Sequence, residues 1–180
     1  MKADIIFISH EHYDHCSKDD VKIISSPGTV VVTCEAGAKK LSSLKSVCKE
    51  IRAMAPGDSC EIDGVGVKAV ASYNTNKEFH LKYTKKLGFI VTMDGVSLYH
   101  AGDTDRIPEM GEVKCDMALL PISGTYVMTA DEAAKAALVM KPKVAIPIHY
   151  GDIIGTDSDA KHFQDVLKGK VEVKILRKEE

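Results

Sequence analysis

His10-Glu11-His12-Tyr13-Asp14-His15 places three imidazoles and an aspartate carboxylate in one short stretch, directly after the apolar run 4–9. A short apolar run of this kind predicts a strand. The first two histidines alternate, so both side chains can lie on one side of an extended segment, while the aspartate and the third histidine follow at the turn. Neutral imidazole and carboxylate suit Zn²⁺, Mn²⁺ and Fe²⁺. A shuffled chain would show the pattern in roughly one case in a thousand, which favours a metal site over a solvated polar loop.

Two later strand ends also carry residues that bind metals. The apolar segment 96–100 runs into Gly102, where the backbone can turn tightly, and then into Asp103. A carboxylate in that position can bridge two ions. The apolar segment 145–148 similarly ends at His149. A turn acid or a hydrogen-bonded loop histidine would explain either residue alone, but three strand ends with such residues together favour a metal site.

A third imidazole is needed to complete the shell of an ion held by the first two histidines of the motif. His162 lies on the last predicted helix, facing solvent. His100 directly precedes the acidic loop, where it orients a ligand or belongs to the strand. His80 lies in the polar loop 72–80, and a loop held over a scaffold is a good place for a ligand. We therefore favour His80.

Length and composition limit the other possibilities. The 180 residues fit a single domain, 1–180. The net charge of −2 and the pI near 6.4 argue against an overall nucleic-acid-binding surface. No apolar run approaches the roughly 20 residues that span a bilayer, and the start of the chain does not resemble a signal peptide. We expect a cytoplasmic protein with reduced cysteines that pack in the interior, Cys16 beside the motif included. The five cysteines are Cys16, Cys34, Cys48, Cys60 and Cys115.

Strand and helix patterns alternate along the chain, and Asp63-Gly64 and Asp94-Gly95 predict two hairpin turns. Hairpins mixed with helices indicate a layered α/β (α+β) sandwich instead of a purely parallel sheet. The predicted strands are 4–9, 29–33, 60–62, 65–71, 88–93, 96–100, 117–120, 143–148 and 171–176, and the predicted helices are 17–25, 35–45, 129–140 and 158–167.

These motifs resemble the metallo-β-lactamase superfamily. The opening stretch matches its HxHxDH pattern, and His80, Asp103 and His149 follow in the order of its three later ligands. Within the superfamily, the chain resembles a branch of uncharacterised prokaryotic hydrolases similar to the ascorbate-6-phosphate lactonase. The resemblance implies an αββα sandwich and covers nearly the whole chain. The segments that carry it are Tyr73-Asn74, Phe79-His80, 99–105, Gly124-Thr125-Tyr126 and 148–151.

The resemblance also implies a two-ion site and a hydrolytic mechanism. The ions are two divalent metals, zinc foremost, with manganese or iron as alternatives. A hydroxide that bridges them would attack the substrate, and Asp14 would also accept the proton of the attacking water. By resemblance, the first ion is held by His10, His12 and His80, the second by Asp14, His15 and His149, and Asp103 bridges the pair.

One feature departs from the family pattern. Members of the superfamily usually carry several strands before the HxHxDH strand, whereas this chain begins at that strand. A bare sheet edge is prone to pair with another chain. We therefore expect a homo-oligomer formed through this edge, or a marginally stable fragment.

The expected substrate is a small anionic ester, lactone or phosphoester. Lys77 and the lysines around His80 would attract an anion, and the backbone amides of 124–126, ahead of a helix, would bind phosphate or carboxylate. Tyr126, Tyr150 and His100 are candidates for contacts with the substrate or its leaving group. They are weaker candidates than the seven predicted metal ligands.

Two other functions stay open on the sequence alone. One is a nuclease or phosphodiesterase related to the tRNA 3′-processing enzymes, which the acidic pI and the lack of a long basic insertion disfavour. The other is a non-catalytic interaction domain stabilised by metal. Structural zinc sites are usually closed cages of four ligands, so a larger ligand set argues against this second alternative.

Overall fold

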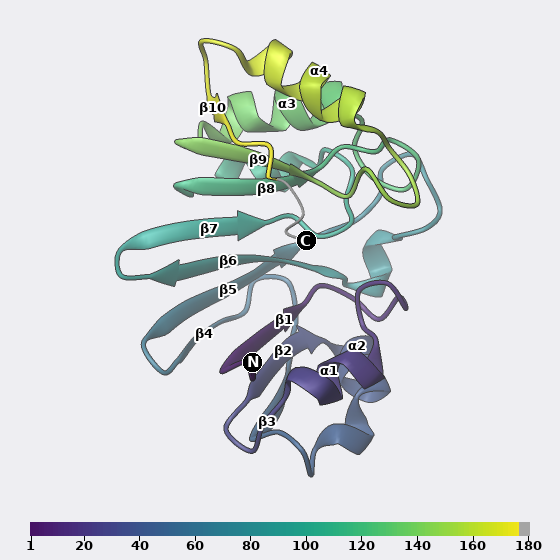
Figure 1. The fold of residues 1–180 in the computed structure, drawn as a ribbon, viewed down its shortest axis with the longest axis vertical. Coiled ribbons are helices and arrows are strands. Elements are labelled where there is room, and N and C mark those ends of the chain that lie inside the picture. Colours follow the sequence, from purple (N-terminus) through teal and green to yellow (C-terminus); the bar gives the residue numbers. More distant parts are fainter. Residues whose placement is uncertain (177–180) are drawn as a thin grey trace.

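Two β-sheets face each other, and helices cover their outer faces, in a computed structural model that describes residues 1–176 (Figure 1). The smaller sheet has the strand order β1-β2-β3, and the larger has the order β10-β9-β8-β7-β6-β5-β4. The strands are β1 (Ile5–Ile8), β2 (Val30–Cys34), β3 (Glu50–Met54), β4 (Ser59–Ile62), β5 (Val65–Ala71), β6 (Leu87–Met93), β7 (Val96–His100), β8 (Met117–Pro121), β9 (Val144–Ile148) and β10 (Glu172–Val173). The helices are α1 (Lys18–Ile24), α2 (Glu35–Lys40), α3 (Ala130–Met140) and α4 (Asp157–Leu167), with short 3₁₀ turns at Ser42–Leu44, Lys82–Thr84 and Pro108–Glu112.

The buried apolar side chains form three clusters, one for each interface between layers. Residues such as Val31 and Leu41 fill the space between the smaller sheet and its helices. Val32 and Phe89 belong to the cluster between the two sheets, where the Phe7 and Phe89 rings lie 5.4 Å apart. Phe163 belongs to the cluster under α3 and α4. Three cores between four layers define the αββα sandwich that the sequence predicted.

Both predicted hairpin turns are present. Asp63 and Gly64 join β4 to β5, and Asp94 and Gly95 join β6 to β7. Their φ angles are 48°, 83°, 50° and 76°, respectively. Positive φ at both central residues is the requirement of the type I′ turn, which Asp-Gly meets at little cost.

The predicted helix 129–140 is confirmed as α3. Thr129 caps it, and the side chain of Glu132 accepts a hydrogen bond from the Thr129 backbone amide at 2.8 Å. Buried alanines then let α3 pack closely against the larger sheet. His162 lies on α4 with an exposed side chain, as predicted, and its Nε2 lies 2.8 Å from a carboxylate oxygen of Asp131.

The sequence placed the ends of two elements wrongly and missed one strand. The helix predicted over 35–45 ends at Lys40 and continues as a 3₁₀ turn, and the last predicted strand shrinks to the two residues of β10. Strand β3 was missed altogether. Its Glu50 and Arg52 form an ion pair at 2.7 Å, so charged side chains interrupt the apolar pattern by which strands are recognised.

Strand direction brings the predicted ligands to one edge of the sandwich. β7, β8 and β9 are parallel, so the segments that follow β7 and β9 emerge at the same edge of the larger sheet. The end of β1 joins them because the Leu87 amide, at the start of β6, donates a hydrogen bond to the Ser9 carbonyl at 3.0 Å. The sequence motif and the later ligand segments therefore meet where the two sheets touch.

β1 pairs with β2 alone among the described strands, so its other side is a sheet edge. The homo-oligomer predicted to form through this edge stays a prediction. Among residues 1–176, no helix combines the length and the apolar character needed to cross a membrane. The cysteines are all free thiols, and burial raises the pKa of Cys16.

Candidate metal centre

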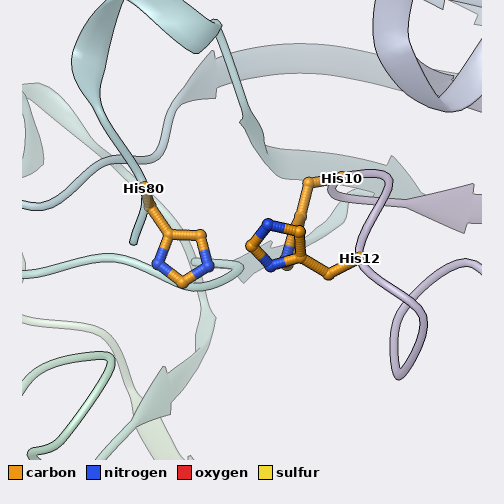
Figure 2. Close-up of side chains that lie close together, drawn as sticks. All are labelled: His10, His12 and His80. Carbon is orange, nitrogen blue, oxygen red and sulfur yellow. The ribbon is translucent and has the colours of Figure 1, made fainter. Parts of the chain in front are cut away.

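The seven predicted metal ligands come together in three overlapping groups, each with ligand atoms within 4.8 Å of one another. Figure 2 shows the first group, in which His80 faces two histidines from the segment after β1. The ring centroids of His10 and His12 lie 4.5 Å apart, and that of His80 lies 5.1 Å and 5.0 Å from theirs. The groups are His10, His12 and His80; His10, His15 and Asp103; and Asp14, His15 and His149.

Asp103 lies between the imidazoles of the two halves of the site. Its Oδ2 atom is 3.5 Å from Nε2 of His80 and 4.0 Å from Nε2 of His10, on one side. On the other side it is 3.3 Å from Nε2 of both His15 and His149. One carboxylate oxygen within reach of both halves is the arrangement that a bridging ligand requires.

In three of the histidines, a hydrogen bond to Nδ1 holds the ring so that Nε2 points into the site. Nδ1 of His10 lies 2.9 Å from the Ser9 hydroxyl, and Nδ1 of His80 lies 3.1 Å from the Asn74 side-chain oxygen. Nδ1 of His149 lies 2.9 Å from the Ser123 hydroxyl. Such contacts fix the tautomer and the orientation of metal-binding histidines. Sequence reasoning assigned no role to Ser9, Asn74 or Ser123, because only the folded chain brings Asn74 and Ser123 to their partners.

Two buried nitrogen atoms are left without a partner. Nε2 of His10 and Nε2 of His80 are fully enclosed and have no hydrogen-bond partner. A buried polar atom without a partner is costly and indicates an ion or a water that belongs there. Both atoms lie in the same group of three imidazoles, whose donor chemistry suits a divalent metal. The residues present therefore fit a metal ion.

At His10, His80 and Asp103 the electrostatics favour the protonation states that metal ligands need, whereas at His149 they favour the protonated ring, whose proton an ion would have to displace. Burial lowers the pKa of His10 to about 2 and that of His80 to about 4, so both rings are neutral at pH 7. Burial alone would raise the pKa of Asp103, but hydrogen bonds from His149 and His15 outweigh it and lower this pKa. The same hydrogen bond to Asp103 raises the pKa of His149. Neutral imidazoles and an ionised carboxylate are the forms that bind metal.

The backbone adopts positive φ angles where two of the ligands are presented, and of these positions only His149 is strained. His149 adopts a φ of 59°, which is rare for a residue other than glycine. Gly102, next to Asp103, has a φ of 66° and packs closely against three other segments. Strained positions of this kind persist where the surrounding structure holds them, and they concentrate at functional sites.

An ion pair between Lys86 and Glu11 holds the HxHxDH segment in place. The Lys86 ammonium is 3% exposed and donates to a Glu11 carboxylate oxygen at 2.9 Å. It also lies 3.3 Å from Nε2 of His12, which leaves Nδ1 of His12 as the nitrogen available to an ion. Lys40 donates a further hydrogen bond to the Glu11 carbonyl at 2.6 Å. The loop between β1 and α1 is thus anchored to β6 and α2 through Glu11.

We expect Lys86→Met to lower the free energy of unfolding by about 3 kcal/mol, because it leaves the partly buried Glu11 carboxylate without its partner. Lys82→Met is the matched control in the same loop. Lys82 pairs with Glu109 at 2.9 Å, but both side chains are substantially exposed, so the loss should be about 0–1 kcal/mol. Urea unfolding of the metal-free proteins measures both values. Equal losses for the two variants would contradict a supporting role for the buried pair.

A cavity of about 430 Å³ opens onto the ligand groups. Tyr126 and Tyr150, two of the predicted substrate contacts, line it. The other two, His100 and Lys77, are not among its lining residues in the described part of the chain. His100 instead accepts a hydrogen bond from the Gly102 amide at 3.1 Å and faces a separate groove between the sheets.

Lys77 is held away from the cavity by Asp105. Its ammonium forms a short ion pair with this carboxylate, and the side chain is 16% exposed. Asp105 also accepts a hydrogen bond from the Thr75 amide at 2.8 Å, so the pair fixes the loop that carries His80. Sequence reasoning placed Lys77 at the substrate because it lies near His80. It could not foresee the ion pair, because Asp105 is 28 positions away in the sequence. The structure gives it a supporting contact instead.

Comparison with known proteins agrees with this architecture. Residues 1–149 match the family model of the β-lactamase superfamily domain. Igni18, described as a novel metallo hydrolase from Ignicoccus hospitalis, aligns with a TM-score of 0.80 and 25% identity over 99% of this chain and 78% of that one. The chain belongs to the metallo-β-lactamase superfamily.

Within the superfamily, the chain is similar to proteins named UPF0173 metal-dependent hydrolases. The Thermoplasma acidophilum protein of that name is 34% identical over 98% of this chain and 78% of its own length. The Thermococcus onnurineus protein is 32% identical over 98% and 80%. A candidate metal-dependent hydrolase from Parabacteroides distasonis, solved as a crystal structure, is 36% identical with a TM-score of 0.85, over 97% of this chain and 76% of that chain. These similarities support a metal-dependent hydrolase.

Proposed function

We propose that this protein hydrolyses a small ester, lactone or phosphoester at a site for two divalent ions. The observation that carries the proposal is the pair of enclosed, unpartnered Nε2 atoms of His10 and His80 beside the central carboxylate of Asp103. Unpartnered buried nitrogens indicate that an ion belongs there, and His80 also lines the cavity, where a substrate could reach the same ion. Zinc is the foremost candidate for the ions, and manganese or iron would suit the same ligands.

We assign one ion to each half of the site, and two of the ligand groups support this assignment. His10, His12 and His80 would hold the first, and Asp14, His15 and His149 the second, with Asp103 between them. Two ions bound there would lower the pKa of a water that they share and polarise the oxygen of the substrate's carbonyl or phosphoryl group.

The chain's own residues supply positioning and proton transfer. Asp14 lines the cavity, and its Oδ2 atom lies 3.2 Å from Nε2 of His15; in the proposed mechanism its carboxylate would accept the proton of the attacking water. Tyr126 and Tyr150 line the same cavity, and their phenol hydroxyls are the candidates to donate a proton to the leaving group. Hydrogen bonds to Ser9, Asn74 and Ser123 keep the imidazoles in place, so little reorganisation is needed when substrate binds.

The two alternatives have less support. A nuclease or phosphodiesterase of the tRNA 3′-processing type would need a basic surface, and the chain has a pI near 6.4. A metal-stabilised interaction domain would not need a cavity of about 430 Å³ that opens onto the ligands. We expect hydrolysis of small substrates.

Turnover of a panel tests the proposal. The protein, stripped of metal and reloaded with Zn²⁺ or Mn²⁺, is given an aryl ester, a lactone and an aryl phosphodiester. We expect hydrolysis of at least one class, which disappears when a chelator removes the ions and returns when metal is restored. Absence of turnover of every class by protein shown by elemental analysis to hold two ions would overturn the proposed function and favour the interaction domain.

A further inference from the structure

The rim of the cavity is apolar on several sides. Phe79 and Tyr126 face each other edge to face, with ring centroids 4.7 Å apart, although they come from different loops. Ile153 and Ile154 line the same cavity from the segment between β9 and α4. Ile153 is 85% exposed and Phe79 is 51% exposed, so the apolar surface stands at the mouth. We call Phe79, Tyr126, Tyr150, Ile153 and Ile154 the apolar rim.

The apolar rim is fixed to the ligands. The side-chain nitrogen Nδ2 of Asn74 donates to the Tyr126 carbonyl at 2.9 Å, and the side-chain oxygen of the same residue contacts Nδ1 of His80. Phe79 precedes His80 directly in the chain. A rim held by the residue that also orients a ligand lies at a defined distance from the reacting centre. It can therefore select the part of the substrate that projects from the centre.

The charges near the mouth are negative. Among the lining residues in the range 1–176 there is no lysine or arginine, while Asp14 and Asp152 are present. The Asp14 carboxylate would be compensated by the ion that it helps to hold, but Asp152 belongs to no ligand group and would repel a negatively charged group that projects past the rim.

The features that predicted an anionic substrate are engaged elsewhere. Lys77 pairs with Asp105, Lys82 with Glu109, and Lys86 with Glu11. In the loop 124–126, the Gly124 amide donates to the Met128 carbonyl at 3.0 Å, and the Thr125 amide donates to the Ser123 carbonyl at 3.1 Å. These three ammonium groups and these two amides are therefore already paired, and Lys85, which is exposed, does not line the cavity.

We propose that the apolar rim selects substrates whose projecting group is uncharged and apolar, such as an aryl or alkyl ester or lactone. The inference rests on the proposed function, since it describes the group attached to the bond that the ions would activate. An apolar group would cover Phe79 and Ile153 and remove their surface from water. A carboxylate on the same group would lose hydration against the rim and gain no cationic partner.

Binding of hydroxamates tests the inference independently of turnover. The probes are phenylacetohydroxamate and its para-carboxy derivative, which share a metal-binding head and differ in one charge. We expect calorimetry on the zinc-loaded protein to give at least roughly tenfold tighter binding of the uncharged probe, as is typical when a pocket rejects a mismatched group. Where the panel shows ester hydrolysis, kcat/KM for the matching phenylacetate esters should show the same preference. Equal or tighter binding of the carboxy probe would overturn the inference.

A charge placed in the rim should weaken or abolish the selection. Ile153→Lys puts an ammonium at an exposed position of the mouth, and we expect the affinity ratio to move by roughly tenfold toward the carboxy probe. Val96→Lys is the control, because Val96 is exposed at 47% on the hairpin between β6 and β7 and does not line the cavity. An unchanged ratio in Ile153→Lys, or an equal change in both variants, would overturn the assignment of the rim. If the unchanged protein hydrolyses no member of the panel but still prefers the uncharged probe, the proposed function is rejected and the inference about the rim stands.

Discussion

Asp103→Asn should reduce metal occupancy from two ions to one or fewer and lower turnover by roughly 10²–10³-fold. The substitution preserves the shape of the side chain but removes the charge of an oxygen that lies within 4.0 Å of Nε2 of His10, His15, His80 and His149. The group of three imidazoles, His10, His12 and His80, stays complete, so one ion should remain. Elemental analysis after zinc loading and desalting measures the occupancy, and the ester panel measures turnover.

Asp152→Asn is the matched control for this experiment. Asp152 lines the same cavity and carries the same charge, but it belongs to none of the three ligand groups. We expect this variant to keep two ions and turnover close to that of the unchanged protein. Full occupancy by two ions in Asp103→Asn would refute the bridging role, and equal loss in both variants would show that charge in the cavity, not ligation, sets the occupancy.

The sequence predicted the metal ligands better than the residues that hold them in place. The ligands follow local sequence patterns, whereas the residues that hold them are distant in the sequence. The HxHxDH stretch is local, and Asp103 and His149 each follow an apolar strand directly, so a linear pattern reveals them. The hydrogen bond between Ser123 and His149 joins positions 26 apart in the sequence, and the pair of Lys77 and Asp105 joins positions 28 apart. Such contacts follow from how loops pack, which no spacing rule records.

The same reasoning explains the fold. Asp-Gly turns and the Thr129 cap are chosen by a few neighbouring residues, so the sequence predicted both hairpins and α3. Strand β3 forms because β2 offers a parallel partner from Val30 to Cys34, although the pattern of Glu50 to Met54 is mixed. Pairing in three dimensions overrides a weak local preference. The sequence favoured His80 over His100 because His80 lies in a polar loop, and the folded chain brings it to His10 and His12.

Gly102→Ala should be among the most damaging single changes in the chain, with a loss of about 3 kcal/mol or more in the free energy of unfolding. An alanine at φ 66° carries a backbone cost of about 1–2 kcal/mol. Its Cβ atom would also lie 2.6 Å from the Leu87 carbonyl oxygen and 3.1 Å from the Ser9 Cβ atom, and overpacking typically adds about 1–3 kcal/mol. For a domain of this size the loss corresponds to a fall of roughly 6–12 °C in Tm.

Gly95→Ala separates the two contributions. Gly95 has a similar φ of 76°, but a Cβ atom there would meet nothing within 4 Å, so only the backbone cost of about 1–2 kcal/mol applies. Urea unfolding and thermal melting of the metal-free variants measure the difference. Leu87 and Ser9 are also the residues whose hydrogen bond joins the two sheets beside the site. A methyl group at 102 therefore pushes on the junction that holds Asp103 near the motif, and Gly102→Ala should lose metal as well as stability. Equal losses of stability in the two variants, with full metal occupancy in both, would mean that the close packing at Gly102 does not position the carboxylate.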